Sequence, residues 1–234
     1  MKNYFFVFLI PLFLTAVNAA PVKLSQDGGE SKTYSIGNFT EVFLSGSFKV
    51  QLIQGRNNSL EVHTSDIKAF DYLDIGNDRG VLRINVKRKL FDFSKVTVYI
   101  TFQELERLEI EGGVQLETKG YLELEDISLH LKGGTKIDFF VKAGKMVIIS
   151  EGGVLFHTEG IAESLDVRMY GAGHVDAGEL QSRDVRFRIE GVGTGKVYPT
   201  SSLNAVIKGA GKIRYKGDPR VSKEIEGLGS VEKE

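Results

Sequence analysis

The residues of this chain best suited to catalysis are carboxylates and arginines that recur on one side of two successive strand-like segments. Asp166 and Arg168 alternate with apolar residues, and Asp184, Arg186 and Arg188 do the same about one repeat later. Enzymes that cleave polysaccharides need clustered carboxylates, or carboxylates beside a cationic base. The pattern therefore permits a polysaccharide-processing enzyme. It also describes an ordinary solvated strand face, which is the interpretation we favour.

Other catalytic and metal-binding patterns are incomplete. The four histidines are scattered, and no two of them share the spacing of metal ligands. The segment from Gly171 to Asp176 is similar to one calcium-binding nonapeptide, but the aspartate does not return at that offset in other repeats. The segment from Gly191 to Lys196 lacks the complete phosphate-loop pattern and a following helix. We therefore expect no catalytic residue, no bound metal and no cofactor.

A glycine-centred motif returns along the second half of the chain about every 20 residues. Apolar residues stand four and two positions before its first glycine and four positions after it in most copies. The leading glycines are Gly112, Gly133, Gly152, Gly171, Gly191, Gly209 and Gly227. A fixed period of about 20 residues marks a solenoid, in which each repeat is one coil stacked on the last. Gly46 ends a similar apolar pattern, which indicates an eighth, divergent copy.

The alternation of apolar and polar residues within each repeat predicts strands, so the fold class is all-β. Because parallel crossovers are almost always right-handed, we expect a right-handed parallel β-helix-like solenoid of about seven to eight coils. Residues 57–103 lack the motif and are expected to supply extra strands that cap the N-terminal part. They also include a short helix from Asp66 to Tyr72, capped by Ser65. The repeat at Gly191 carries two extra residues, which indicates a bulge.

The N-terminus predicts export. Lys2 precedes an apolar run that is too short to span a bilayer, and Val17-Asn18-Ala19 fits a cleavage site. We interpret residues 1–19 as a signal peptide, 20–32 as a flexible leader and 33–234 as a single domain, with no transmembrane segment after cleavage. The chain has no cysteine and a formal net charge of -1. It must therefore be held together by its core, and it is not a nucleic-acid binder.

Stacked repeats align their side chains in columns. Three columns define a candidate groove: the residue before the leading glycine, the residue after it, and the residue three positions after it. The residue before the leading glycine varies in charge along the repeats, which also suits a ladder of ion pairs that fixes the register. The residue after the leading glycine is small in the first four copies, either for backbone geometry alone or to let an extended polysaccharide or peptide approach. The candidate groove residues are Gly113, Gly134, Gly153, Ala172, Lys132, Tyr170, Lys136 and His174.

The chain resembles the head GIN domain family of auto-transporter adhesins over almost its whole length after the signal peptide. The resemblance rests on residues 39–46, on Gly-Ala-Gly at 171–173 and 209–211, on residues 196–198 and on residues 213–219. It implies a β-helix-like fold of parallel coils, with no known enzymatic activity or cofactor. The early repeats differ from the family in using Gly-Gly in place of Gly-x-Gly.

These observations favour a non-catalytic exported protein of the cell envelope or cell surface that serves in binding, adhesion or scaffolding. Its location is the periplasm, the outer-membrane surface or the extracellular space, and its partner is a glycan or an envelope protein. Two alternatives stay open at this point: a polysaccharide-processing enzyme on a β-helix, and a purely structural module that associates with itself through exposed strand edges.

Overall fold

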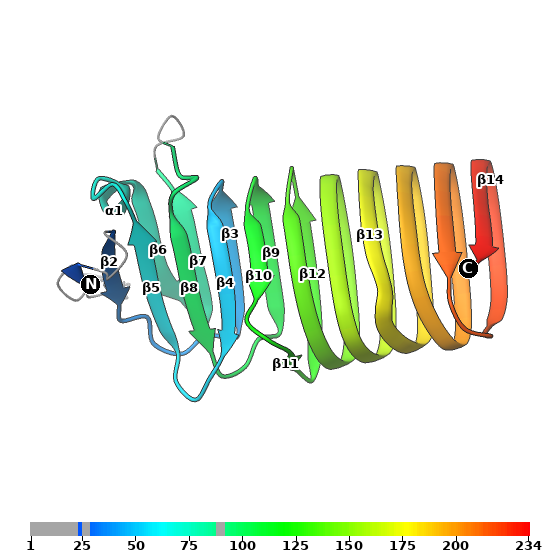
Figure 1. The fold of residues 1–234 in the computed structure, drawn as a ribbon, viewed down its shortest axis with the longest axis horizontal. Coiled ribbons are helices and arrows are strands. Elements are labelled where there is room, and N and C mark those ends of the chain that lie inside the picture. Colours follow the sequence, from blue (N-terminus) through cyan, green and yellow to red (C-terminus); the bar gives the residue numbers. More distant parts are fainter. Residues whose placement is uncertain (1–22, 25–28, 88–91) are drawn as a thin grey trace, which may run out of the picture.

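The computed structural model describes residues 23–24, 29–87 and 92–234; the predicted signal peptide lies outside the described residues. The described chain is almost entirely β-structure, as the alternation predicted, and it contains one very short helix (Figure 1). The elements are β1 (Lys23–Leu24), β2 (Glu30–Tyr34), β3 (Glu41–Gly46), β4 (Lys49–Gln54), β5 (Ser59–Thr64), α1 (Ala69–Tyr72), β6 (Leu73–Asp78), β7 (Val81–Val86), β8 (Thr97–Phe102), β9 (Arg107–Gly112), β10 (Gln115–Thr118), β11 (Leu122–Glu123), β12 (Asp126–Lys132), β13 (Lys136–Tyr215) and β14 (Arg220–Lys233).

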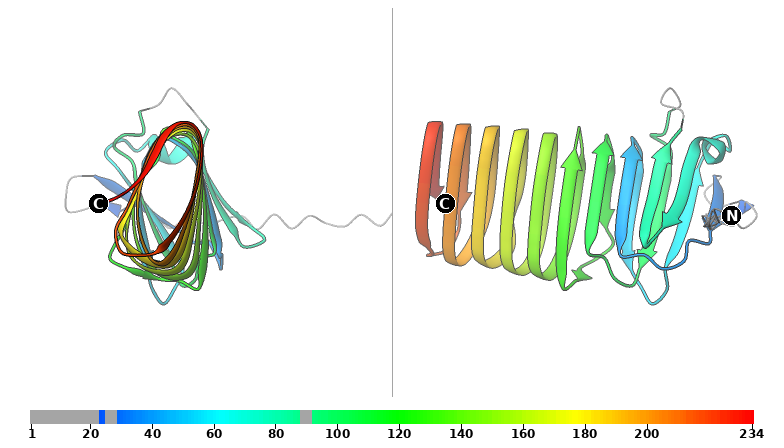
Figure 2. Two further views of the ribbon diagram at one scale, coloured as in Figure 1. Left: turned by 90° about the vertical axis from the view of Figure 1, so that its right-hand side faces the viewer. Right: turned by 180° about the vertical axis from the view of Figure 1, so that it is seen from behind.

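The strands form one mixed sheet. Pairs β1–β2, β2–β5, β5–β8 and β6–β7 are antiparallel and lie in the N-terminal part of the chain. The pairs that join β3, β4 and β7 to β14 through the repeats are parallel. Figure 1 shows β13 as one ribbon that winds repeatedly, and the end-on view in Figure 2 shows its turns lying one behind another around a common flattened outline.

Residues one repeat apart are register partners, as the glycine spacing predicted. Leu129 of β12 pairs with Leu108 of β9 on one side and with Ile148 of β13 on the other. At the far end, Ile207 of β13 pairs with Ile225 of β14. The same apolar column therefore continues from coil to coil, where a coil means one passage of the chain from one leading glycine to the next.

The leading glycines stack at one edge of the coils, which we call the glycine corner. Gly46 pairs in register with Gly112, the partner that a divergent copy of the motif at Gly46 would have. Every leading glycine has a positive φ, for example 126° at Gly209. A Cβ atom added at Gly209 would lie 2.3 Å from the carbonyl oxygen of Gly191. The corner therefore needs glycine both for its backbone conformation and for the closeness of the neighbouring coil.

The inward columns of the coils form one continuous apolar core that runs from Tyr34 to Val231. Aromatic residues stack within it, and the rings of Phe139 and Phe156 lie 6.4 Å apart. In the coil of Gly191 the chain places Gly195 where other coils carry a larger apolar residue, and the ring of Phe187 occupies that space. This coil thus exchanges a large residue for a small one at this inward position, next to a large aromatic residue.

The N-terminal part contains the extra strands and the short helix that we expected, but the helix is shorter than predicted. It spans Ala69–Tyr72 with Lys68 at the N-cap, and no side chain caps it, so the predicted capping role of Ser65 is wrong. The side chain of Asp66 accepts a hydrogen bond from the backbone N–H of Lys68. This local bond forms a turn where the first helical turn was expected. The strand β1 and the first residues of β2 fall within residues 20–32, the predicted leader.

Candidate binding surface

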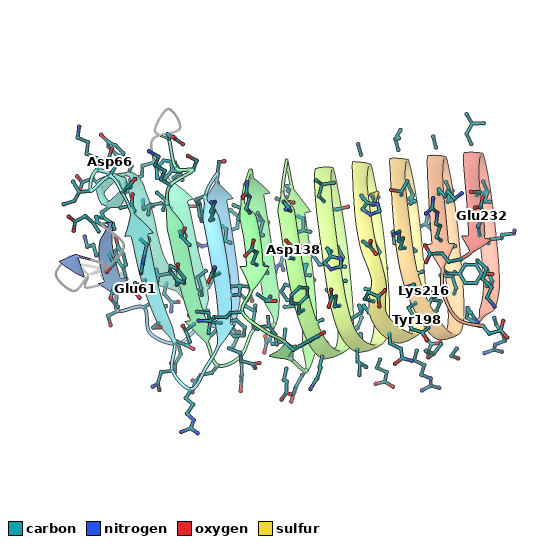
Figure 3. All side chains as sticks on the ribbon, viewed as in Figure 1. Glu61, Asp66, Asp138, Tyr198, Lys216 and Glu232 are labelled. Carbon is teal, nitrogen blue, oxygen red and sulfur yellow. The ribbon has the colours of Figure 1, made fainter. Side chains whose placement is uncertain are left out.

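The coils present two outer faces that meet at the glycine corner. The first face carries β3, β9, β12 and the matching segments of β13 and β14, all of which end at the corner. The second face carries β4, β10 and the segments that follow the corner. Figure 3 shows side chains projecting outward from the coils, among them Asp138, which belongs to the second face.

The predicted groove residues follow the glycine corner and do not share one face. Lys132 ends β12 and Tyr170 lies at the same offset, so both belong to the first face. Lys136 begins β13, and His174 lies at the same offset on the second face, where its Nδ1 atom is 2.6 Å from Thr194 Oγ1. The small residues Gly113, Gly134, Gly153 and Ala172 lie between these two sets, and we call them the corner strip.

Two of those small residues have free space around them. A Cβ atom added at Gly134 or at Gly153 would meet no atom within 4 Å, and neither residue has a positive φ. Their glycines are therefore not required by backbone geometry, in contrast to Gly133 and Gly152, which precede them. Because packing does not explain these two glycines, the corner strip stays a candidate for ligand contact.

The column before the leading glycine contains part of the predicted charge ladder. Lys132 Nζ lies 3.7 Å from Glu111 Oε1, and Lys208 Nζ lies 3.3 Å from Glu226 Oε1. These pairs are partly exposed, so each contributes less than about 1 kcal/mol. Lys132 is therefore engaged in register pairing as well as lying beside the corner strip.

Two adjoining hollows lie on the first face, away from the corner. They enclose about 740 and about 460 Å³. The residues that line both are Asp166, Arg168, Arg186 and Asn204. The larger hollow continues over Asp184, Ser202 and Arg220, and the smaller one reaches Tyr170 and Arg188. The structure thus brings together the carboxylates and arginines that the sequence singled out, and it places one predicted groove residue, Tyr170, at their rim.

Most charges in the hollows are held by neighbours. Arg168 donates two hydrogen bonds to Asp166, from Nε to Oδ1 at 3.2 Å and from Nη2 to Oδ2 at 2.8 Å, and this contact raises the pKa of Arg168 above its usual value. Arg188 Nη1 lies 3.1 Å from Glu190 Oε1. Ser202 donates a hydrogen bond of 2.5 Å to Asp184.

These contacts bear on catalysis. Both oxygens of Asp166 serve to fix Arg168, and Asp184 accepts a bond from Ser202. A glycosidase needs one carboxyl group that gives a proton to the leaving oxygen and a second that acts as base or nucleophile. In the hollows, both carboxylates are instead already engaged by a neighbouring side chain. Among the described residues, no group of three or more histidine and acidic side chains could hold a metal ion.

Sequence reasoning missed several residues of the hollows. Asn204, Ser202 and Arg220 lie one or two coils beyond Arg186, and they face the same space only because the coils stack. These residues could have been identified by aligning the repeats and following the polar columns of the Asp166 and Asp184 segments into the next coils.

A row of aromatic side chains on the second face was also missed. The rings of Tyr121 and Phe140 lie 5.9 Å apart, and those of Phe140 and His157 lie 6.1 Å apart edge to face. Tyr121 is 51% exposed, and His157 Nε2 lies 3.1 Å from Glu159 Oε1. The residues come from neighbouring coils, so only the register brings them together.

Fold and surface together define a repetitive, almost all-β protein whose polar hollows lie on an extended strand face. The family model described as putative auto-transporter adhesin, head GIN domain, matches residues 38–219. The chain belongs to this family.

Solved structures share the fold. A putative adhesin from Bacteroides fragilis is 20% identical, with a TM-score of 0.81, and the match covers 90% of this chain and 99% of that one. A putative adhesin from Parabacteroides merdae is 20% identical, with a TM-score of 0.63 and coverage of 88% and 96%. A protein from Parabacteroides distasonis described as a putative lipid binding protein is 22% identical, with a TM-score of 0.60 and the same coverages. No curated protein matches the chain. In the described part of the chain, no helix has the length and apolar character needed to cross a membrane.

Proposed function

We propose that this protein is a non-catalytic binding module of the cell envelope that holds an extended ligand, a glycan or a segment of an envelope protein, on its first face. The observation that carries the proposal is the pair of adjoining hollows that share Asp166, Arg168, Arg186 and Asn204. Together they continue across several coils, which suits a chain-like ligand better than a compact small molecule. The adhesin description of the family supports a binding role.

The corner strip extends the proposed surface. Tyr170 lines the smaller hollow and also borders the strip of Gly134, Gly153 and Ala172. A ligand that passes over the rim at Tyr170 would meet backbone there, because the strip has no long side chains. Lys136 and His174, on the second face, would contact only a ligand that crosses the corner.

The proposal also includes the handedness of the β-helix and the cellular location of the protein. The parallel register between successive repeats supports a right-handed parallel β-helix of about seven to eight coils, since parallel crossovers take that hand. The signal-like residues 1–19 support export to the periplasm, the outer-membrane surface or the extracellular space. N-terminal sequencing of the secreted protein should begin at Ala20.

The first experiment is a glycan-array screen of residues 20–234, followed by capture of partners from envelope extract. We expect a saturable ligand whose binding falls in an Asn204→Ala variant, because Asn204 lines both hollows. Gly134→Lys and Gly153→Lys variants test the corner strip separately, and free space at both positions lets them fold. A ligand that binds all of these variants as well as the parent chain would contradict the proposed surface.

A further inference from the structure

The larger hollow carries an excess of positive charge. Its lining contains four cations, Lys145, Arg168, Arg186 and Arg220, and two carboxylates, Asp166 and Asp184. The whole chain has a formal net charge of -1. The hollow is thus a local cationic site on a slightly acidic protein, and a site of this kind attracts anions.

Arg186, Arg220 and Lys145 are the cations of this hollow whose side chains have no ion-pair partner among the described residues, and of these three Arg186 also lines the smaller hollow. Arg168 is held by both oxygens of Asp166, and Asp184 accepts a bond from Ser202. No ion pair or hydrogen bond joins the exposed Arg186 side chain to another described residue, although Arg186 lines both hollows. Its planar guanidinium can bind a carboxylate through two parallel hydrogen bonds.

The groups around Arg186 select among anions. Asn204 and Ser222 offer neutral donors and acceptors in the larger hollow, while Glu190 and Glu224 line the smaller one. Sugar hydroxyls can donate to such carboxylates, whereas the side chains of an acidic peptide only accept and would be repelled by them. The mixture of unpaired guanidinium groups with amide, hydroxyl and carboxylate acceptors therefore suits a ligand that carries both hydroxyl and carboxylate groups.

We propose that the first face binds a polysaccharide containing uronic acid residues, and that Arg186 holds the carboxylate of one of them. This inference rests on the proposed binding function and specifies its ligand class. Neighbouring coils lie about 4.8 Å apart, so an acidic polymer that follows the coil stack reaches Arg220, two coils beyond Arg186, with another of its charges.

The experiment compares two forms of one polymer by isothermal titration calorimetry: polygalacturonate and the same polymer with its carboxyl groups methyl-esterified. We expect polygalacturonate to bind, with affinity that falls as salt is added, and the neutral ester to bind roughly tenfold more weakly or not at all. Arg186→Gln should lose roughly tenfold in affinity for polygalacturonate, and Arg186→Lys should lose less, because it keeps the charge without the bidentate geometry.

Arg214→Gln is the matched control, since Arg214 is an exposed strand residue on the second face and its replacement changes the net charge equally. It should bind as the parent chain does, and unchanged circular dichroism establishes that each variant is folded. Equal binding of polymer and ester, or full binding by Arg186→Gln, overturns the inference. Binding of both forms that falls in Asn204→Ala would leave the proposed function standing while overturning the uronate assignment. Tighter binding of polyglutamate than of polygalacturonate overturns it in favour of an acidic peptide.

Discussion

At the scale of single residues, the two adjacent glycines of each early repeat have different physical roles. The first adopts a positive φ and lies against the neighbouring coil, whereas the second has an ordinary backbone and, at Gly134 and Gly153, free space. The sequence predicted the positions of both glycines from their period. It could not separate their roles, because a glycine required by φ and a glycine free to change look the same in one sequence.

This difference predicts the effect of adding one methyl group. Gly209→Ala should lower the free energy of unfolding by about 2 kcal/mol or more, because it combines a left-handed backbone with an added Cβ atom 2.3 Å from the Gly191 carbonyl oxygen. Gly134→Ala should change it by less than about 0.5 kcal/mol. Urea unfolding followed by circular dichroism measures both. Equal effects at the two positions would refute the assigned role of the corner.

Tyr34 predicts a loss of stability at alkaline pH. Its hydroxyl is buried without a hydrogen-bond partner, and burial, together with the nearby Asp71, raises its pKa from 10.0 to about 12. Because the folded-state pKa lies above the unfolded value, the stabilisation is complete below pH 10 and is lost as pH rises from about 10 to about 12. The full loss, reached above pH 12, is at most about 3 kcal/mol, because each pKa unit corresponds to about 1.4 kcal/mol.

Tyr34→Phe isolates this effect. The variant cannot ionise at this position, so its melting temperature should fall less than that of the parent chain between pH 9 and pH 12. Near pH 7 it should be equally stable or slightly more stable, because it removes a buried hydroxyl with no partner. Parallel melting curves for the two proteins over the whole pH range would rule out a raised pKa at Tyr34.

At the scale of the strand, period-2 alternation predicted which side chains face inward, since burial on one side imposes it directly. Val167 and Met169, for example, are fully buried as expected. Alternation says nothing about which strands pair. The antiparallel order of β2, β5 and β8, and the meeting of Arg186 with Asn204, depend on register between segments that a single sequence does not encode locally.

Packing within a coil gives a prediction at the same scale. Gly195→Val should destabilise the protein by about 1–3 kcal/mol, because its Cβ atom would lie 2.4 Å from the Phe187 ring. Phe187→Val should destabilise it through the cavity that it leaves. In the double variant the new valine fills part of that cavity. The double variant should therefore be more stable than the sum of the single effects indicates, by at least about 0.5 kcal/mol. Additive effects in urea unfolding would contradict the proposed exchange of a large residue for a small one.

At the scale of the whole molecule, stability depends on stacking. Each coil offers only a few buried apolar side chains, and ordering about 20 residues costs about 1–2 kcal/mol per residue, so an isolated coil cannot fold. The core nevertheless continues without interruption from Tyr34 to Val231. The antiparallel strands near the N-terminus and the repeats therefore share one core, and we expect residues 33–234 to unfold as a single domain.

A shared core predicts that a destabilising substitution at one end of the molecule also lowers the stability of the other end. Leu52→Ala in β4 and Ile207→Ala near the end of β13 each remove a fully buried side chain and should cost about 2–5 kcal/mol. Hydrogen exchange measured by mass spectrometry under native conditions can follow peptides from β4 and from residues 203–213 separately. If slow exchange in both peptides requires global unfolding, either substitution should speed exchange in both by a similar factor. Acceleration confined to the peptide that carries the substitution would show that the two ends unfold independently, and residues 33–234 would then comprise more than one cooperative unit.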